Sequence, residues 1–367
     1  MKIAQIAPLI ESVPPRSYGG TERIVSYLTE ELVRLGHDVT LFASGDSVTS
    51  ASLVSCATTA LRLDPHVRDP IPYYMLMLDR VRRCAEEFDI LHFHIDQFHF
   101  PLFRTLANST VTTLHGRQDL PDLRPFYFEF SDMPLVSISD SQRGPIRNAN
   151  FVATVHHGLP TGLIRPTFNP RGGYLAFLGR ISPEKGVDRA IRIAQALGIP
   201  FKIAAKVDRV DEAYFRERIE PLLKLPGVEY IGEITEREKS DFLGQALALM
   251  FTIDWPEPFG LAMIESMASG TPVLAFRRGS VEEVVEPGVT GEIVDSIEQA
   301  ILALPRVLNL NRRKVRRRFE ERFASDRMAK DYLRVYKSLL SPKRGSIRTE
   351  PMQHPTRLDI EPNEPVN

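Results

Sequence analysis

The chain has 367 residues, of which 46 are Lys or Arg and 47 are Asp or Glu, so its formal net charge is −1. This balance excludes a strongly basic nucleic-acid-binding protein and an acidic disordered chain, and we expect no nucleic-acid partner. With 43% apolar and 25% charged residues the composition is that of a globular protein, and the length calls for two or three domains.

The cysteine content and the apolar runs bear on the compartment of the protein. Cys56 and Cys84 are too few for a disulfide framework, which favours a reducing environment. The N-terminal segment lacks the apolar core of a signal peptide, and no apolar run approaches the ~20 residues that span a bilayer. We therefore expect a cytoplasmic protein, and leave open peripheral contact with the inner membrane face.

The first half of the chain alternates predicted strands with helices. Strands are predicted over residues 2–6, 39–43, 90–94, 111–114 and 135–138. After the first strand comes a Pro- and Gly-rich loop ending in Gly19-Gly20, and Thr21 then caps a helix with apolar residues at helical spacing up to Leu35. A strand, a glycine-containing loop, a helix and a second strand are typical of a parallel α/β unit.

The same pattern restarts after a loose stretch that ends at Gly172-Gly173. Strands are predicted over residues 174–178, 201–204, 228–231, 246–253 and 273–275, and helices from 183 to about 198 and over 211–223, 236–244 and 260–269. We predict two Rossmann-like domains, residues 1–165 and 166–325, which face each other across a cleft. A helix over 326–340 is predicted to pack back on the first domain, and a Pro-rich tail over 341–367 to be disordered. Ligands of open α/β sheets bind beyond the carboxyl ends of the strands, so the cleft is the predicted site.

Two carboxylates flank the predicted start of the helix that opens near Gly260. Pro258 and Gly260 leave backbone amides able to meet an anion or sugar hydroxyls. Glu265 lies at the edge of the apolar face of this helix, where a half-buried carboxylate would need a partner such as a ligand diol. The alternatives are an exposed Glu265 paired with a Lys, and a Glu257 that only caps the helix.

Two cations precede another predicted helix. Ser182 and Pro183 suit the N-cap and first position of a helix, which places Lys185 in its first turn. A cation there is unfavourable unless an anion is bound, and Arg180 lies close enough in sequence to converge with it on one diphosphate. The alternative is a solvated pair of cations.

These motifs resemble those of the retaining glycosyltransferases of family 4, the glycosyl transferases group 1, which have the GT-B architecture of two Rossmann-like domains. The resemblance is carried by Glu-x-Phe-Gly-x-x-x-x-Glu from Glu257 to Glu265, by Gly270-Thr271-Pro272-Val273, by the segment 288–291, and by the segment 179–186. It implies a hexosyltransferase that moves a sugar from a nucleoside-diphosphate donor to a hydroxyl acceptor, which could be a glycan, a lipid-linked molecule or a small molecule. It also implies retention of the anomeric configuration and no requirement for a metal or another cofactor.

The resemblance assigns a role to each candidate residue. Glu265 would hold the ribose hydroxyls, and Glu257 would face the hydroxyls of the donor sugar, where it is also the nearest candidate for a covalent nucleophile. Arg180 and Lys185 would neutralise the leaving diphosphate. The remaining expected contacts are the amides of Phe259, Gly260 and Leu261 to the donor, the Gly19-Gly20 loop to a phosphate or the acceptor, and His115 to the donor sugar.

The sequence departs from the family pattern at two positions. His157-Gly158 stands where Asn-Gly is common, which weakens any role carried over to position 157, and Gly279-Ser280 stands where Gly-Gly is common. Glu283 then falls at the matching acidic position.

Several alternative interpretations remain open. His92, His94 and His99 could be metal ligands, although a strand-end role is favoured. The basic run over 312–318 favours a solvated helix surface over contact with anionic lipid. An epimerase or a phosphorylase on the same fold, or a non-catalytic sugar-nucleotide-binding protein, would share many of these features. A dinucleotide-dependent oxidoreductase would need Gly-x-Gly-x-x-Gly after the first strand, which is not found there.

Overall fold

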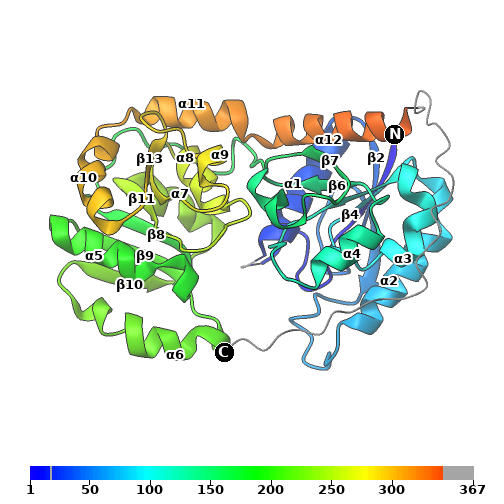
Figure 1. The fold of residues 1–367 in the computed structure, drawn as a ribbon, viewed down its shortest axis with the longest axis horizontal. Helices are drawn as coiled ribbons and strands as arrows, with labels where there is room; N and C mark the ends of the chain where they lie inside the picture. The colour runs from blue at the N-terminus through cyan, green and yellow to red at the C-terminus, as the bar shows by residue number, and fades with distance from the viewer. Residues whose placement is uncertain (17–18, 342–367) are drawn as a thin grey trace.

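The computed structural model describes residues 1–16 and 19–341, which form two α/β units side by side (Figure 1). Each unit contains one sheet, and all pairings between its strands are parallel. The fold class predicted from the sequence, two Rossmann-like domains facing each other, is confirmed. The predicted disordered tail lies, from residue 342 onward, outside the described residues.

The N-terminal sheet has seven strands in the order β3-β2-β1-β4-β5-β6-β7. They are β1 (Lys2–Ile6), β2 (Asp38–Ser44), β3 (Ser52–Ala57), β4 (Ile90–Phe93), β5 (Thr110–Thr113), β6 (Leu135–Ser137) and β7 (Phe151–Thr154). The helices of this unit are α1 (Gly20–Arg34), α2 (Ile71–Arg83), α3 (Phe100–Phe103) and α4 (Leu123–Glu129). Every residue of β4 and β5 is buried, as expected for central strands covered on both faces.

The C-terminal sheet has six strands in the order β10-β9-β8-β11-β12-β13. They are β8 (Leu175–Arg180), β9 (Phe201–Lys206), β10 (Val228–Gly232), β11 (Ala248–Phe251), β12 (Val273–Phe276) and β13 (Gly291–Val294). Its helices are α5 (Val187–Leu197), α6 (Glu212–Tyr214), α7 (Glu236–Gln245), α8 (Leu261–Ala268), α9 (Val281–Val284), α10 (Ile297–Leu308) and α11 (Arg312–Arg322).

Three local predictions were wrong. Helix α1 begins at Gly20 after Gly19, so Thr21 is not its cap. Gly186, with φ of 65°, separates a short 3-10 turn over Pro183–Lys185 from α5, so Lys185 precedes that helix instead of lying in its first turn. The single helix predicted over 211–223 is a succession of short helical segments that includes a π-helical stretch, Phe215–Ile219.

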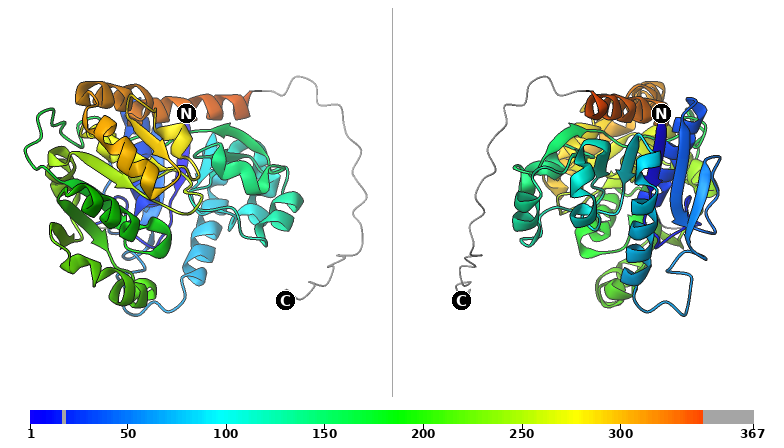
Figure 2. Two further views of the ribbon diagram at one scale, coloured as in Figure 1. Left: turned by 60° about the vertical axis from the view of Figure 1, so that its left-hand side comes forward. Right: turned by 90° about the vertical axis from the view of Figure 1, so that its right-hand side faces the viewer.

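The last helix, α12 (Ser325–Leu340), returns to the N-terminal unit. Helices α11 and α12 run along one side of the molecule, α11 over the C-terminal unit and α12 over the N-terminal one (Figures 1 and 2). The Tyr332 hydroxyl is 2.9 Å from Thr113 Oγ1, and the Tyr336 hydroxyl is 2.7 Å from His92 Nδ1. The domain boundary near residue 165 stays a prediction; β7 ends at Thr154 and β8 begins at Leu175.

The basic run on α11 is the predicted solvated surface only in part: Arg313, Lys314 and Arg317 are exposed, but two arginines face inward. Arg312 and Arg316 are only 9% and 7% exposed. Arg312 donates to the carbonyls of Thr167, Ala246 and Gly244, and Arg316 to those of Ile164, Ala268 and Thr161. These two guanidinium groups bind backbone oxygens of the C-terminal unit and of the interdomain connection, because their spacing of four residues puts both on the inner face of the helix. Within residues 1–16 and 19–341, no helix has the length and apolar character needed to cross a membrane.

Candidate active site

A cleft of about 460 Å³ lies between the two units, at the carboxyl ends of the strands. It is lined by all ten residues to which the family resemblance assigns a role: Gly19, Gly20 and His115 from the N-terminal unit, and Arg180, Lys185, Glu257, Phe259, Gly260, Leu261 and Glu265 from the C-terminal unit. The structure thus brings the candidates together, while their individual roles stay predictions.

The loop before α8 is shaped by Gly260. Its φ is 84°, and a Cβ at this position would lie 2.6 Å from Met263 Cε and 2.9 Å from Phe251 Cζ. Only glycine therefore fits, and the chain turns so that α8 directs its N-terminus at the cleft. Across the cleft, a Cβ on Gly20 would be 3.5 Å from Leu261 Cδ1, so the glycine loop of the N-terminal unit lies directly against the first residue of α8.

Glu257 is held by two side chains from its own unit. Its carboxylate pairs with Lys185 Nζ and accepts a hydrogen bond of 2.9 Å from Trp255 Nε1. Lys185 Nζ also lies 4.8 Å from the centre of the Trp255 ring. Lys185 and Glu257 are thus neighbours in one ion pair, and a diphosphate that bound Lys185 would compete with Glu257 for it.

Arg180 lies among three carboxylates. Its guanidinium is 2.5 Å from Glu184, 3.4 Å from Asp208 and 3.8 Å from Asp211. These contacts differ from the solvated pair of cations considered as the alternative. They hold the guanidinium at the edge of the cleft, so a diphosphate that bound Arg180 would compete with these carboxylates for its N–H groups.

Glu265 is buried, with only 5% of its surface exposed, and it is paired with a lysine. Lys239 Nζ of α7 lies 2.6 Å from Glu265 Oε1 and 3.3 Å from Glu236 Oε2, and Glu236 pairs in turn with Arg23 of the N-terminal unit. The structure combines the two interpretations of this residue: Glu265 is buried, as the first required, and it is paired with a lysine, as the alternative held for an exposed Glu265. Nothing in the spacing of Lys239 and Glu265 pointed to this pair, because they lie on different helices.

His115 is a neutral imidazole at the end of β5. Its Nε2 is 2.9 Å from Nδ1 of His94, and burial lowers the pKa of His115 to about 3. His157, for which the departure from the family pattern argued against a role, stacks on His115 with ring centres 5.3 Å apart and packs against Phe259 at 4.9 Å. His157 therefore belongs to the cleft wall, and was missed because an unusual residue type was taken as evidence against it.

The histidines considered as metal ligands have other partners. His92 lies within 2.7 Å of both the Tyr336 hydroxyl and Thr113 Oγ1, and His94 Nε2 is 2.8 Å from Gln5 Oε1. His99 Nε2 is 2.9 Å from Thr112 Oγ1. In the part of the chain that the structure describes, no group of three or more His, Cys, Asp or Glu side chains could hold a metal ion.

Comparisons with known proteins bear on the family and the fold. Residues 165–325 match the family model described as glycosyl transferases group 1, and residues 18–138 match that of glycosyltransferase family 4. A phosphatidyl-myo-inositol mannosyltransferase of Mycobacterium leprae is 24% identical over 92% of this chain and 97% of its own length. A GDP-mannose-dependent alpha-(1-6)-phosphatidylinositol dimannoside mannosyltransferase of Mycobacterium tuberculosis is 28% identical over 48% of this chain, which spans only 50% of that relative.

Solved structures share the architecture as well. Anabaena HepE, whose crystal structure is in complex with UDP-glucose, superposes with a TM-score of 0.68 at 14% identity, over 92% of this chain and 100% of that one. At this identity the likeness concerns the fold alone. Together the two family models span five of the seven strands of the N-terminal sheet and all six strands of the C-terminal sheet. The chain therefore belongs to the group 1 glycosyltransferases of family 4, and is a glycosyltransferase with the GT-B fold.

Proposed function

We propose that this protein transfers a hexosyl group from a nucleoside-diphosphate sugar to a hydroxyl acceptor, with retention of the anomeric configuration. The observation that carries the proposal is the convergence on one cleft of a buried carboxylate, Glu265, a helix N-terminus at Gly260 and two cations, Arg180 and Lys185. A nucleoside-diphosphate sugar offers a matching set of groups: a ribose diol, a diphosphate and a polyhydroxylated ring.

Each part of this donor finds a chemical partner in the cleft. The carboxylate of Glu265 can accept hydrogen bonds from two neighbouring ribose hydroxyls. The N-terminus of α8 and the side chains of Arg180 and Lys185 would surround the diphosphate and stabilise the negative charge that develops on the leaving oxygen. We propose that these groups replace a divalent metal, so that no metal cofactor takes part.

The sugar would lie toward Glu257 and His115. Glu257 is an acceptor of hydrogen bonds from sugar hydroxyls, and it is also the carboxylate nearest to where a covalent intermediate would form. His115 remains neutral at physiological pH because of its depressed pKa, so it can serve the sugar as a hydrogen-bond partner without adding charge. Attack by the acceptor on the same face as the departing diphosphate is equally consistent with this arrangement.

The relatives support a sugar-nucleotide donor but name different bases. One is described as GDP-mannose-dependent and another was crystallised with UDP-glucose. The decisive experiment is a thermal-shift screen of the protein with UDP, GDP, ADP and TDP sugars, followed by transfer to a panel of hydroxyl acceptors. A shift with sugars of one base would identify the donor class. The anomeric signal of the product, read by NMR, tests retention. Absence of any shift and of any transfer would contradict the proposal.

A further inference from the structure

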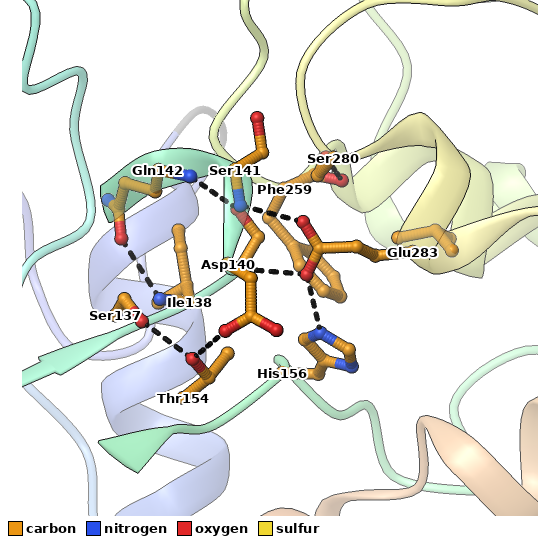
Figure 3. Close-up of polar contacts among 12 residues, drawn as sticks. Ser137, Ile138, Asp140, Ser141, Gln142, Thr154, His156, Phe259, Ser280 and Glu283 are labelled. Carbon is orange, nitrogen blue, oxygen red and sulfur yellow. Dashed lines mark hydrogen bonds and ion pairs between the residues drawn. The ribbon is translucent and has the colours of Figure 1, made fainter. Parts of the chain in front are cut away.

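A second polar cluster joins the two units beside the cleft, and it is centred on Glu283 of α9 (Figure 3). Its carboxylate accepts hydrogen bonds from two successive backbone N–H groups of the N-terminal unit, those of Asp140 at 2.7 Å and Ser141 at 2.8 Å. His156 Nε2, in the connection between the units, lies 3.2 Å from the same carboxylate. Burial acts to raise the pKa of Glu283, but the hydrogen bonds from His156 and the two amides outweigh it and lower the pKa.

The two backbone amides form a binding site with two N–H donors, which a carboxylate matches with its two acceptor oxygens. Each oxygen of Glu283 accepts from a different N–H group, Oε2 from Asp140 and Oε1 from Ser141, so the contact is bidentate. A glutamine of the same shape would present its NH₂ group to one of these donors, so one of the two bonds would become a contact between donors. The contact with the two amides therefore requires the negative charge of the Glu283 side chain, its length and the orientation of its carboxylate.

The residues just before Glu283 bind the loop that carries Glu257. The Ser280 backbone N–H donates to the Glu257 carbonyl at 3.0 Å, and Ser280 Oγ donates to the Phe259 carbonyl at 2.8 Å. Gly279 has φ of 56°, and a Cβ there would lie 2.4 Å from the Glu257 nitrogen, so the two segments are in direct backbone contact. Helix α9 and the segment Glu257–Phe259 consequently form one packed piece, with Glu283 at one end and the candidate reacting carboxylate at the other.

We propose that Glu283 is a positioning residue, which docks the N-terminal unit at Asp140–Ser141 and thereby sets the segment Glu257–Phe259 against the His115 side of the cleft. It acts through backbone contacts and does not touch the substrate. The consequence for the reaction rests on the proposed function, whereas the docking contact itself does not. The neighbouring Glu282 offers a matched comparison, since its side chain is 60% exposed and pairs with Arg277 of the same unit.

Glu283→Gln tests the proposal and Glu282→Gln is the control. We expect E283Q to lower kcat by about tenfold or more, because displacing reacting groups by about 1 Å can cost about a hundredfold. The donor KM should change by less than about threefold, because the ribose anchor Glu265 is untouched. E282Q should leave both values within about twofold, and Glu283→Asp, which keeps the charge, should recover part of the loss.

Hydrogen–deuterium exchange at the amides of Asp140 and Ser141 measures docking without any substrate. These amides should exchange about tenfold faster or more in E283Q, and at the wild-type rate in E282Q. Unchanged exchange in a folded E283Q variant would overturn the docking contact. Faster exchange with unchanged kcat would overturn the positioning role. If the wild-type protein transferred no sugar at all, the proposed function would fail, and the exchange rates would still decide whether Glu283 docks the two units.

Discussion

Replacing Glu265 by glutamine is the sharpest test of how the donor is bound. The side chain is buried, its neighbours are known, and glutamine has nearly its shape, so the substitution changes charge more than packing. The wild-type carboxylate would accept two charge-assisted hydrogen bonds from the ribose, each contributing about 1.5–3 kcal/mol. Glutamine has one acceptor oxygen in place of two, so one ribose hydroxyl loses its acceptor and the other donates a neutral bond, which contributes about 0.5–1.5 kcal/mol.

The difference corresponds to a loss of about 2.5–4.5 kcal/mol in donor binding, or about a 60- to 2000-fold weaker affinity. The effect should appear in the donor KM and in the dissociation constant measured by calorimetry. Because the ribose is remote from the bond that breaks, kcat at saturating donor should fall much less than kcat/KM.

Lys239→Met separates the ribose contact from the ion pair that Glu265 makes. This variant removes the 2.6 Å contact from Lys239 but leaves the carboxylate of Glu265 in place. We expect the thermal stability to fall, because a buried charge loses its partner, while the donor affinity changes by less than about tenfold.

A donor KM in E265Q within about threefold of the wild-type value, with the fold intact, would refute the ribose assignment.

Three further predictions address other parts of the chain. Lys185→Met should lower kcat by about 100-fold or more, since it removes a cation from the leaving diphosphate, and steady-state kinetics at saturating donor would show this; retention of full kcat would argue against that role. Arg316→Met should lower the urea midpoint of unfolding strongly, because three carbonyls lose a buried charged donor, at a cost of about 3–5 kcal/mol. The control Arg317→Met, at a site 64% exposed, should leave the midpoint nearly unchanged. Equal midpoints for the two variants would contradict the buried role of Arg316. The pKa of His115 is about 3 in the folded protein, below its ordinary value of 6.5, so the unfolded chain binds a proton at this residue more tightly than the folded protein does. The free energy of unfolding should therefore decline as the pH falls below about 6.5. A urea midpoint equal at pH 7.5 and pH 5.5 would contradict this.

The alternation of apolar strands and amphipathic helices was readable because the central strands are buried on both faces. Some of the elements that were missed lie where this signal is weak. Strand β3 is at the edge of its sheet, and most of its residues are exposed or half-buried, so it shows no continuous apolar run. The break between Lys185 and α5 depends on the left-handed conformation of Gly186, which a helix-start pattern of Ser and Pro concealed.

The site residues could be named from motif spacing, but their partners could not. Lys239 and Glu265, and likewise Glu283 and the amide of Ser141, meet only after the chain has folded. Backbone amides have no sequence signature at all, so an acidic residue that binds them resembles any surface glutamate. The two buried arginines of α11 were missed for a related reason, since charge density alone does not tell which side of a helix faces protein.

The return of the chain to the N-terminal unit has a practical consequence for engineering. The two chain segments that connect the units are in contact with each other. A Cβ on Gly158 would lie 2.5 Å from the Ala324 carbonyl oxygen, and Leu159 forms a β-bridge with Ala324. Helix α12 then packs on the N-terminal unit through the side chains of Tyr332 and Tyr336, which are both fully buried. A chimera that exchanges N-terminal units between relatives should therefore carry two segments of one parent, the first sheet and residues 325–340. A single cut between the domains would leave the transplanted half with an empty groove where its last helix belongs.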